Sequence, residues 1–190
     1  MASKIEPLLT ITDLETMPDD DGNRYELIEG ELYVSSAPGL THQMVSDNIV
    51  YLIRTYLEQN PIGIVVSTVG LILSEYNGVI PDIVFFRNED YGRIVSNERL
   101  YAAPEIVIEI LSAESTNVRR DRVAKYRLYE KYGVKEYWIV DRDQQSIEVF
   151  RPDDQKLVLA ANLKDEDNLT TPVLPGLSLS VRRILSLPKP

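Results

Sequence analysis

The sequence predicts a fold of the mixed α/β (α+β) class, and three features support this prediction. Two segments, residues 42–59 and 118–132, carry apolar residues at the three- and four-residue spacing of an amphipathic helix. Short runs rich in β-branched and aromatic residues, such as 79–86 and 105–111, have the length and composition of strands. The chain has 190 residues, 44% of them hydrophobic and 26% charged, so we expect one globular domain over residues 1–190.

The composition excludes several kinds of site. The chain has no cysteine and a single histidine, His42, which excludes disulfides, thiolate zinc sites, cysteine nucleophiles and multi-histidine metal centres. A net charge of −10 argues against a protein that coats DNA with its whole surface, but it is compatible with a locally basic groove. The N-terminus lacks a basic start followed by a long apolar run, so we expect a cytoplasmic protein.

The first part of the chain predicts a short helix and a hairpin. Residues 1–23 are expected to form an N-terminal arm, in which Thr12 caps a short helix and Glu15 completes a capping box. Two apolar runs, residues 25–28 and 31–34, are separated by a Glu-Gly dipeptide. This pattern predicts a β-hairpin.

A long helix and further strands follow. Thr41 is the expected N-cap of the helix over residues 42–59, and the dipeptide Asn60-Pro61 ends it. Residues 62–74 are rich in Val and Ile and suit either one longer strand or a pair of strands. After a turn, another strand is expected to begin close to Asp82.

The second helix is expected to follow a buried strand directly. Residues 87–104 are polar and are expected to form an irregular loop before the strand at 105–111. Residues 112–117 are rich in helix-capping side chains and precede the helix over 118–132, with Gly133 as its C′ residue.

The C-terminal third predicts additional β structure. A strand over residues 134–140 is followed by a turn and by two antiparallel strands, 146–150 and 156–160. A last helical turn is expected near residues 181–185.

Two carboxylates stand inside apolar strands, where they are unusual. Asp82 lies at the head of one predicted strand and Glu109 lies deep inside another. A lone buried carboxylate costs several kcal/mol, so such residues are normally paired or bound to a metal. A divalent cation would compensate both charges. The alternatives are that Asp82 caps a turn and that Glu109 lies on an edge strand with one solvated face.

A lysine on the second helix could complete this site. Lys125 lies on the inward stripe of the helix, whose members are spaced by three and four: Val118, Asp121, Lys125, Leu128 and Tyr132. There it could hold a phosphate or a developing negative charge, whereas the alternative is a solvated lysine. Magnesium or manganese prefers carboxylates and carbonyls, and the carbonyl of Ile110 could also face the ion. These residues favour metal-assisted hydrolysis of a phosphate ester.

The motifs that carry these residues resemble a known family. The segments YELIEGEL, THQ, VIPDIVFF, PEIVIEILSAES, KYRLYEKYGVKEYWIVD and LPGL occur in this order. Together, over about residues 24–179, they resemble the Uma family of predicted restriction endonucleases in the PD-(D/E)xK nuclease superfamily. The resemblance implies a restriction-endonuclease-like αβββαβ core with a mixed central sheet flanked by helices. It also implies magnesium-dependent cleavage of DNA phosphodiester bonds.

The resemblance assigns roles to individual positions. Asp82 and Glu109 match the two acidic residues, and Lys125 matches a lysine that lies on the following helix in this family. Leu111 stands where the superfamily usually has its lysine. His42 stands near the place of an acid that the first helix often supplies.

Further candidates have both functional and structural interpretations. His42, at a helix start, could assist catalysis or act as a surface or capping residue. Glu31 in the first hairpin is a candidate additional metal ligand, although most carboxylates of a hairpin are solvated. The arginines at positions 119, 120 and 122 could contact DNA phosphates or simply be exposed at a helix start.

The function expected from these observations is that of a metal-dependent DNA endonuclease. Its catalytic residues would be Asp82, Glu109, Lys125 and His42, and its metal ligands would come from residues 82, 109, 110 and 31. One alternative is a non-catalytic domain of the same fold that binds DNA or a protein, and another is a phosphoesterase for a small substrate. Cutting both strands requires two sites, so a homodimer is also expected.

Overall fold

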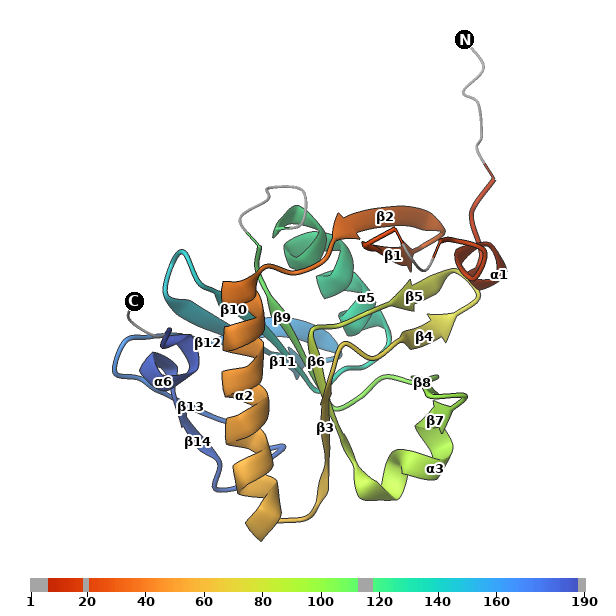
Figure 1. Ribbon diagram of the computed structural model, residues 1–190. Helices are drawn as coiled ribbons and strands as arrows, with labels where there is room; N and C mark the ends of the chain where they lie inside the picture. Colours follow the sequence, from red (N-terminus) through yellow and green to blue (C-terminus); the bar gives the residue numbers. More distant parts are fainter. Residues whose placement is uncertain (1–6, 19–20, 113–117, 188–190) are drawn as a thin grey trace.

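The computed structural model describes residues 7–18, 21–112 and 118–187, and it has a six-stranded central sheet with a layer on each face (Figure 1). The strand order in this sheet is β12-β11-β10-β9-β6-β3. Its strands are β3 (Gly63–Ser67), β6 (Ile83–Arg87), β9 (Ile106–Ile110), β10 (Glu136–Asp141), β11 (Ser146–Asp153) and β12 (Lys156–Lys164). Strands β9 and β10 are parallel, whereas the other neighbours in this sheet are antiparallel. The predicted mixed sheet is therefore confirmed.

A second sheet packs beside the first and contains the N-terminal hairpin. Its strands are β1 (Asn23–Ile28), β2 (Glu31–Ser36), β4 (Leu71–Ser74), β5 (Asn77–Val79), β7 (Val95–Ser96) and β8 (Arg99–Leu100), in the order β2-β1-β5-β4-β8-β7. The predicted hairpin turn is present, with positive φ angles of 53° at Glu29 and 80° at Gly30, as a two-residue type I′ turn requires. The segment 62–74 forms two strands, one in each sheet.

One face of the central sheet is covered by α2 (Leu40–Gln59). The helix buries Val45, Ile49 and Ile53 against the sheet, as the apolar spacing predicts. It begins earlier than expected, at Leu40, so Thr41 is not its N-cap. The hydroxyl of Thr41 instead accepts a hydrogen bond from Arg142, a long-range contact that local capping patterns do not contain.

The opposite face is covered by the second helix and by the hairpin sheet (Figure 1). The second helix contains a π-helical segment, η2 (Arg120–Lys125), which follows α-helical residues 118–119 and is continued by the α-helix α5 (Tyr126–Lys131). π-helical turns are rare and occur often at functional sites. Gly133 follows with a φ of +76°, as the prediction of a C′ glycine requires. Of the cap-rich segment expected before this helix, residues 113–117 lie outside the described residues.

The ends of the chain differ from the prediction in detail. Helix α1 (Ile11–Leu14) is capped by Thr10 in a capping box with Asp13, so the expected cap at Thr12 is wrong. Residues 1–6 and 19–20 of the N-terminal arm lie outside the described residues. The C-terminal part forms β13 (Asn168–Thr170), β14 (Ser178–Ser180) and α6 (Val181–Leu185), which confirms the last helical turn.

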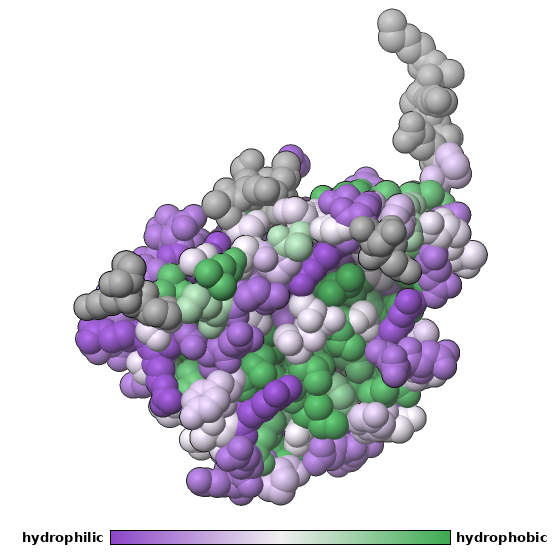
Figure 2. Space-filling view, in the orientation of Figure 1, coloured by the Kyte–Doolittle hydropathy of each residue, from purple (hydrophilic) through white to green (hydrophobic). Residues whose placement is uncertain are grey.

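The loop expected between the two acidic strands is partly ordered into short elements. Besides β7 and β8, residues 87–104 contain η1 (Asn88–Asp90) and α3 (Tyr91–Ile94). Figure 2 shows hydrophilic side chains around the periphery of one face and apolar surface near β3, the edge strand of the central sheet. Within the described residues, no helix combines the length and the apolar character needed to cross a membrane.

Candidate active site

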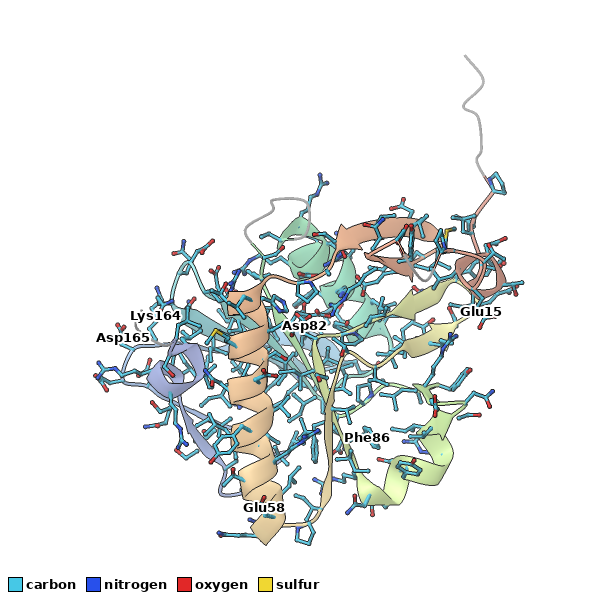
Figure 3. All side chains as sticks on the ribbon, in the orientation of Figure 1. Glu15, Glu58, Asp82, Phe86, Lys164 and Asp165 are labelled. Carbon is cyan, nitrogen blue, oxygen red and sulfur yellow. The ribbon has the colours of Figure 1, made fainter. Side chains whose placement is uncertain are left out.

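Asp82 and Glu109 are neighbours across two adjacent strands. The antiparallel register of β6 and β9 pairs Ile83 with Ile108, and one further step brings Asp82 opposite Glu109. Side chains two residues apart in a strand point to the same face of the sheet, so Asp82 points the same way as Val84, and Glu109 the same way as Val107. Both valines belong to the core cluster on the face covered by the second helix. The two carboxylates therefore project from the same face of the sheet. Figure 3 shows Asp82 near the centre of the molecule, close to the N-terminal end of α2.

The backbone of β9 holds the Asp82 carboxylate in place. Asp82 Oδ2 accepts a hydrogen bond from the N–H of Ile110 at 2.8 Å. Strand β6 begins only at Ile83, so the edge of β9 beyond that point is free to receive this side chain. In a strand the N–H and C=O of one residue point to the same side, so the carbonyl of Ile110 also faces the Asp82 edge.

His42 reaches Asp82 from the other face of the sheet. The imidazole comes from the first turn of α2, and its Nε2 lies 3.1 Å from Asp82 Oδ2. His42 is 7% exposed, and its buried Nδ1 has no hydrogen-bond partner among the described residues. Burial alone would raise the pKa of Asp82, but the hydrogen bonds from His42 and Ile110 and the charge of Lys125 lower it overall.

Glu109 lies in the interior of the sheet. Strand β9 is flanked by β6 and β10, so the edge-strand alternative is wrong. Glu109 is 2% exposed, and its Oε1 accepts hydrogen bonds from Lys125 Nζ at 2.9 Å and from the Tyr129 hydroxyl at 2.7 Å. Burial raises the pKa of Glu109 to about 8, against the opposing effect of Lys125 and with further raising by neighbouring carboxylates.

Lys125 is the central cation of the cluster and is 1% exposed. Its Nζ lies 2.9 Å from Glu109 Oε1, 2.9 Å from Glu26 Oε1 and 3.7 Å from Asp121 Oδ1. Burial would lower the pKa of Lys125, but these three carboxylates outweigh that effect and raise it. The lysine is therefore positively charged at neutral pH, and the solvated-lysine alternative is wrong.

Glu26 of β1 belongs to the site, although the sequence pattern favours Glu31 among the hairpin glutamates. Its carboxylate accepts a hydrogen bond from the N–H of Ile80 at 2.8 Å and forms ion pairs with Lys125 at 2.9 Å and with Arg120 at 3.3 Å. It is 3% exposed and is followed by two buried apolar residues, so the signal that identified Glu109 was present here too.

Glu31, the hairpin residue that was selected, is not brought to this cluster. It is exposed at the turn end of the hairpin, opposite Ile28, and its carboxylate accepts a hydrogen bond from Tyr33 at 3.1 Å.

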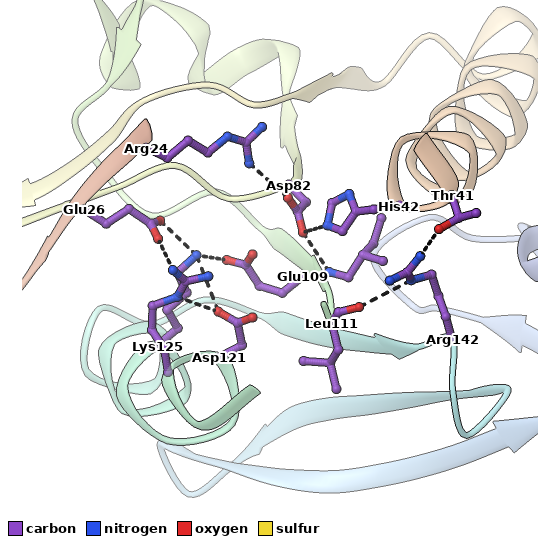
Figure 4. Close-up of polar contacts among 12 residues, drawn as sticks. Arg24, Glu26, Thr41, His42, Asp82, Glu109, Leu111, Asp121, Lys125 and Arg142 are labelled. Atoms are coloured by element: carbon purple, nitrogen blue, oxygen red, sulfur yellow. Dashed lines mark hydrogen bonds and ion pairs between the residues drawn. The ribbon is translucent and has the colours of Figure 1, made fainter. Parts of the chain in front are cut away.

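The carboxylates line a cavity of about 260 Å³ between the central sheet, the hairpin and the start of α2 (Figure 4). Three arginines line it, at positions 24, 120 and 142. Arg24 Nη1 lies 3.5 Å from Asp82 Oδ1, and Arg142 donates hydrogen bonds to Thr41 and, at 3.4 Å, to the carbonyl of Leu111. Figure 4 shows Arg142 and Lys125 on opposite sides of Glu109.

The oxygen donors around the cavity fit a divalent cation. Its four carboxylates belong to residues 26, 82, 109 and 121, and the cations paired with them are Arg24, Arg120 and Lys125. Arg142 is a fourth cation on the wall of the cavity, so the cations and the carboxylates balance when all of them are ionised. Among the described residues, no three His, Asp or Glu side chains are already grouped as ligands, so two carboxylates and a carbonyl are the donors that a metal would find.

Comparisons with known proteins are consistent with this architecture. The family described as Uma2, "Putative restriction endonuclease", matches residues 11–182. A solved structure described as a "putative nuclease belonging to DUF820" from Anabaena variabilis has a TM-score of 0.73 and 22% sequence identity, and the match covers 93% of this chain and 97% of that chain. This likeness shows the fold. No curated protein matches the chain.

Proposed function

The chain belongs to the Uma2 family of restriction-endonuclease-like proteins, and from this premise we propose that it is a magnesium-dependent DNA endonuclease. The observation that carries the proposal is the convergence of Asp82 and Glu109 on one face of the central sheet, with Lys125 Nζ 2.9 Å from the second carboxylate. Two adjacent carboxyl groups and a buried lysine suit hydrolysis of a phosphodiester better than binding alone, because a structural role would not need three ionisable groups in the core.

In this proposal the metal ligands are Asp82, Glu109 and the carbonyl of Ile110. When bound, Mg²⁺ or Mn²⁺ would supply a hydroxide nucleophile near neutral pH and would neutralise phosphate charge. Because the four carboxylates and the four cations around the cavity balance when ionised, a bound divalent cation would make the cavity positively charged. That charge matches a phosphodiester group.

Lys125 acts as an electrostatic group. Its pKa is raised, so it does not serve as a general base at neutral pH, and it can instead stabilise the negative charge that develops on the phosphate. His42 orients the Asp82 carboxylate through its 3.1 Å contact and is a positioning residue. Glu26 holds Lys125 from the side opposite Glu109, and Glu31 has no role in this scheme.

The test is cleavage of supercoiled plasmid DNA with Mg²⁺ or Mn²⁺, compared between the parent protein and Asp82→Asn. We expect nicking by the parent that disappears with a chelator and in the variant. Equal cleavage by the parent and the variant would overturn the assignment of Asp82. Comparison with RNA and with a small phosphodiester would separate a DNA endonuclease from a phosphoesterase of broader or smaller substrate range.

A second candidate function is a non-catalytic domain that keeps the nuclease fold to bind DNA or a protein. The observation that favours it is the double occupation of Glu109 Oε1 by Lys125 and Tyr129, which leaves that oxygen satisfied without a metal. Calorimetric titration with Mg²⁺ and Mn²⁺ distinguishes the two functions, because this second candidate predicts no binding at millimolar metal.

The endonuclease proposal also includes a homodimer, because two centres are needed to cut both strands of a duplex. Sedimentation of the protein with and without duplex DNA would measure this. A monomer that nicks a single strand would agree with the chemistry and contradict the dimer.

A further inference from the structure

The arginines near the site differ in whether a carboxylate compensates their charge. Arg120 pairs with Glu26 at 3.3 Å and with Asp121 at 3.1 Å, and Arg122 pairs with Asp141 at 3.2 Å. The charges of these two side chains are therefore neutralised by ion pairs within the protein. Of the arginine cluster that the sequence analysis singled out at the helix start, Arg119 is the member that remains exposed, with no ion pair among the described residues.

Two more arginines with uncompensated charge lie close by. Arg127 is exposed on α5 and has no carboxylate within ion-pair distance among the described residues. Arg142 is held by uncharged oxygens, those of the Thr41 side chain and the Leu111 backbone, so its position is set but its charge is not neutralised. Arg87, by contrast, has an acidic partner in Glu105, at 3.0 Å.

The three arginines border two adjoining hollows. Arg142 lines the cavity that contains Asp82, whereas Arg119 and Arg127 line a second hollow between the hairpin and the second helix. The two hollows share Arg120 on their walls. Arg119 and Arg127 are eight residues apart along the second helix, and both line the second hollow. A path along these hollows therefore meets a free cation on each side of the carboxylate pair.

We propose that Arg119, Arg127 and Arg142, here called the rim arginines, bind phosphates of the DNA backbone on both sides of the cleaved bond. This inference rests on the proposed endonuclease function and adds the residues that hold the substrate. The physical reason is that a polyanion gains most from cations that no acidic partner neutralises. Such contacts fix the position of the strand and carry no base specificity.

The experiment measures binding of a fluorescent DNA duplex without Mg²⁺ over 50 to 200 mM salt, for the parent, Arg142→Ala and the double variant R119A/R127A. Each lost phosphate contact should reduce the slope of log affinity against log salt by about 0.9. The drop in affinity across this salt range should then be about 3.5-fold smaller for each contact removed. The reduction should be equal for duplexes of unrelated sequence.

Arg54→Ala is the matched control, because Arg54 is an exposed arginine of α2 that lines neither hollow. Its salt slope should equal that of the parent. Arg142→Lys should keep the slope but bind more weakly, because lysine keeps the charge and loses the fork that contacts Thr41 and Leu111. Thermal unfolding of each variant identifies any loss of fold.

The outcomes separate this inference from the proposed function. If the parent binds and cleaves DNA while the rim variants keep its salt slope, the proposed role of the rim arginines is wrong and the endonuclease function is retained. The same conclusion follows if Arg54→Ala lowers the slope as much as Arg142→Ala does. If the parent binds DNA through the rim arginines but never cleaves it, the DNA-binding role of these arginines is retained and the proposed catalytic function is wrong. A parent that binds no DNA overturns both.

Discussion

Lys125 Nζ and Glu109 Oε1 lie 2.9 Å apart and form an ion pair between the second helix and the central strand β9. Both side chains are almost fully buried, and Glu26 approaches the same Nζ at 2.9 Å from the hairpin sheet. The lysine thus joins three separate elements of the fold at one point. Removing it affects both the charge of the cavity and the contact between the layers.

Lys125→Met should reduce DNA cleavage by at least about 100-fold, the usual loss when one preorganised group that stabilises transition-state charge is removed. Plasmid nicking at saturating Mg²⁺ measures the effect. Lys131→Met is the control, because Lys131 lies on the same helix but is exposed, 3.4 Å from Glu29. Equal loss in both variants would contradict a specific role for Lys125.

Asp82→Asn should abolish metal binding and cost the metal-free protein only modest stability. The amide keeps the size of the side chain and can still accept the N–H of Ile110, whereas Asp82→Ala would leave that buried N–H unpaired at a cost of about 1–3 kcal/mol. Urea unfolding of the two variants, together with Mn²⁺ titration, checks this order of stabilities. An alanine variant as stable as the asparagine variant would show that the hydrogen bond contributes nothing.

Glu26→Gln should impair cleavage, whereas Glu31→Gln should leave it unchanged. Glu26 helps to hold Lys125 and Arg120, and a neutral amide would weaken both contacts while retaining an acceptor for Ile80. Glu31 is exposed at the other end of the hairpin. The comparison of kcat for the two variants tests which hairpin glutamate belongs to the site. Impairment by Glu31→Gln alone would reverse the assignment.

The stability of the metal-free protein should fall as the pH rises from about 5 to 8. The pKa of Glu109 is raised from 4.5 to about 8, so the native state holds a proton more tightly than the unfolded chain does. Its contribution is therefore fully present below pH 4.5 and is lost as the pH rises through 8. Asp82 acts in the opposite direction, but its lowered pKa confines that effect to pH values below about 4.

The same proton makes metal binding depend on pH. A cation that binds the Glu109 carboxylate displaces the proton, so Mn²⁺ should raise the melting temperature more at pH 8 than at pH 6. Glu109→Gln should remove this part of the pH dependence, and differential scanning fluorimetry at the two pH values measures it. An equal metal-induced shift at both pH values in the parent would contradict the raised pKa.

The sequence alone was sufficient to identify the residues whose chemistry conflicts with their local surroundings. Asp82 and Glu109 stand out because carboxylates are rare inside apolar strands, and Lys125 stands out because it interrupts the apolar stripe of a helix. Both helices, the hairpin turn at Gly30 and the helix end at Gly133 were likewise predicted, because periodicity and glycine conformation are local properties.

Local signals were weaker where several candidates competed. Thr12 and Thr41 are good capping residues by type, yet α1 is capped by Thr10 and α2 begins at Leu40. Thr41 is instead engaged by Arg142, about a hundred residues later in the chain. Capping residues contribute only about 1 kcal/mol, so tertiary contacts readily determine which of several candidates is used.

The sequence by itself determined which ionisable residues had to be compensated in the core, because the cost of burying a charge depends on the residue and its apolar neighbours. Only the tertiary structure decided which partners compensate them. It selected Glu26 over Glu31, committed Arg120 and Arg122 to ion pairs and left Arg142 uncompensated. These outcomes depend on strand register and sheet packing, which bring together groups far apart in the chain and are set by the sum of many contacts.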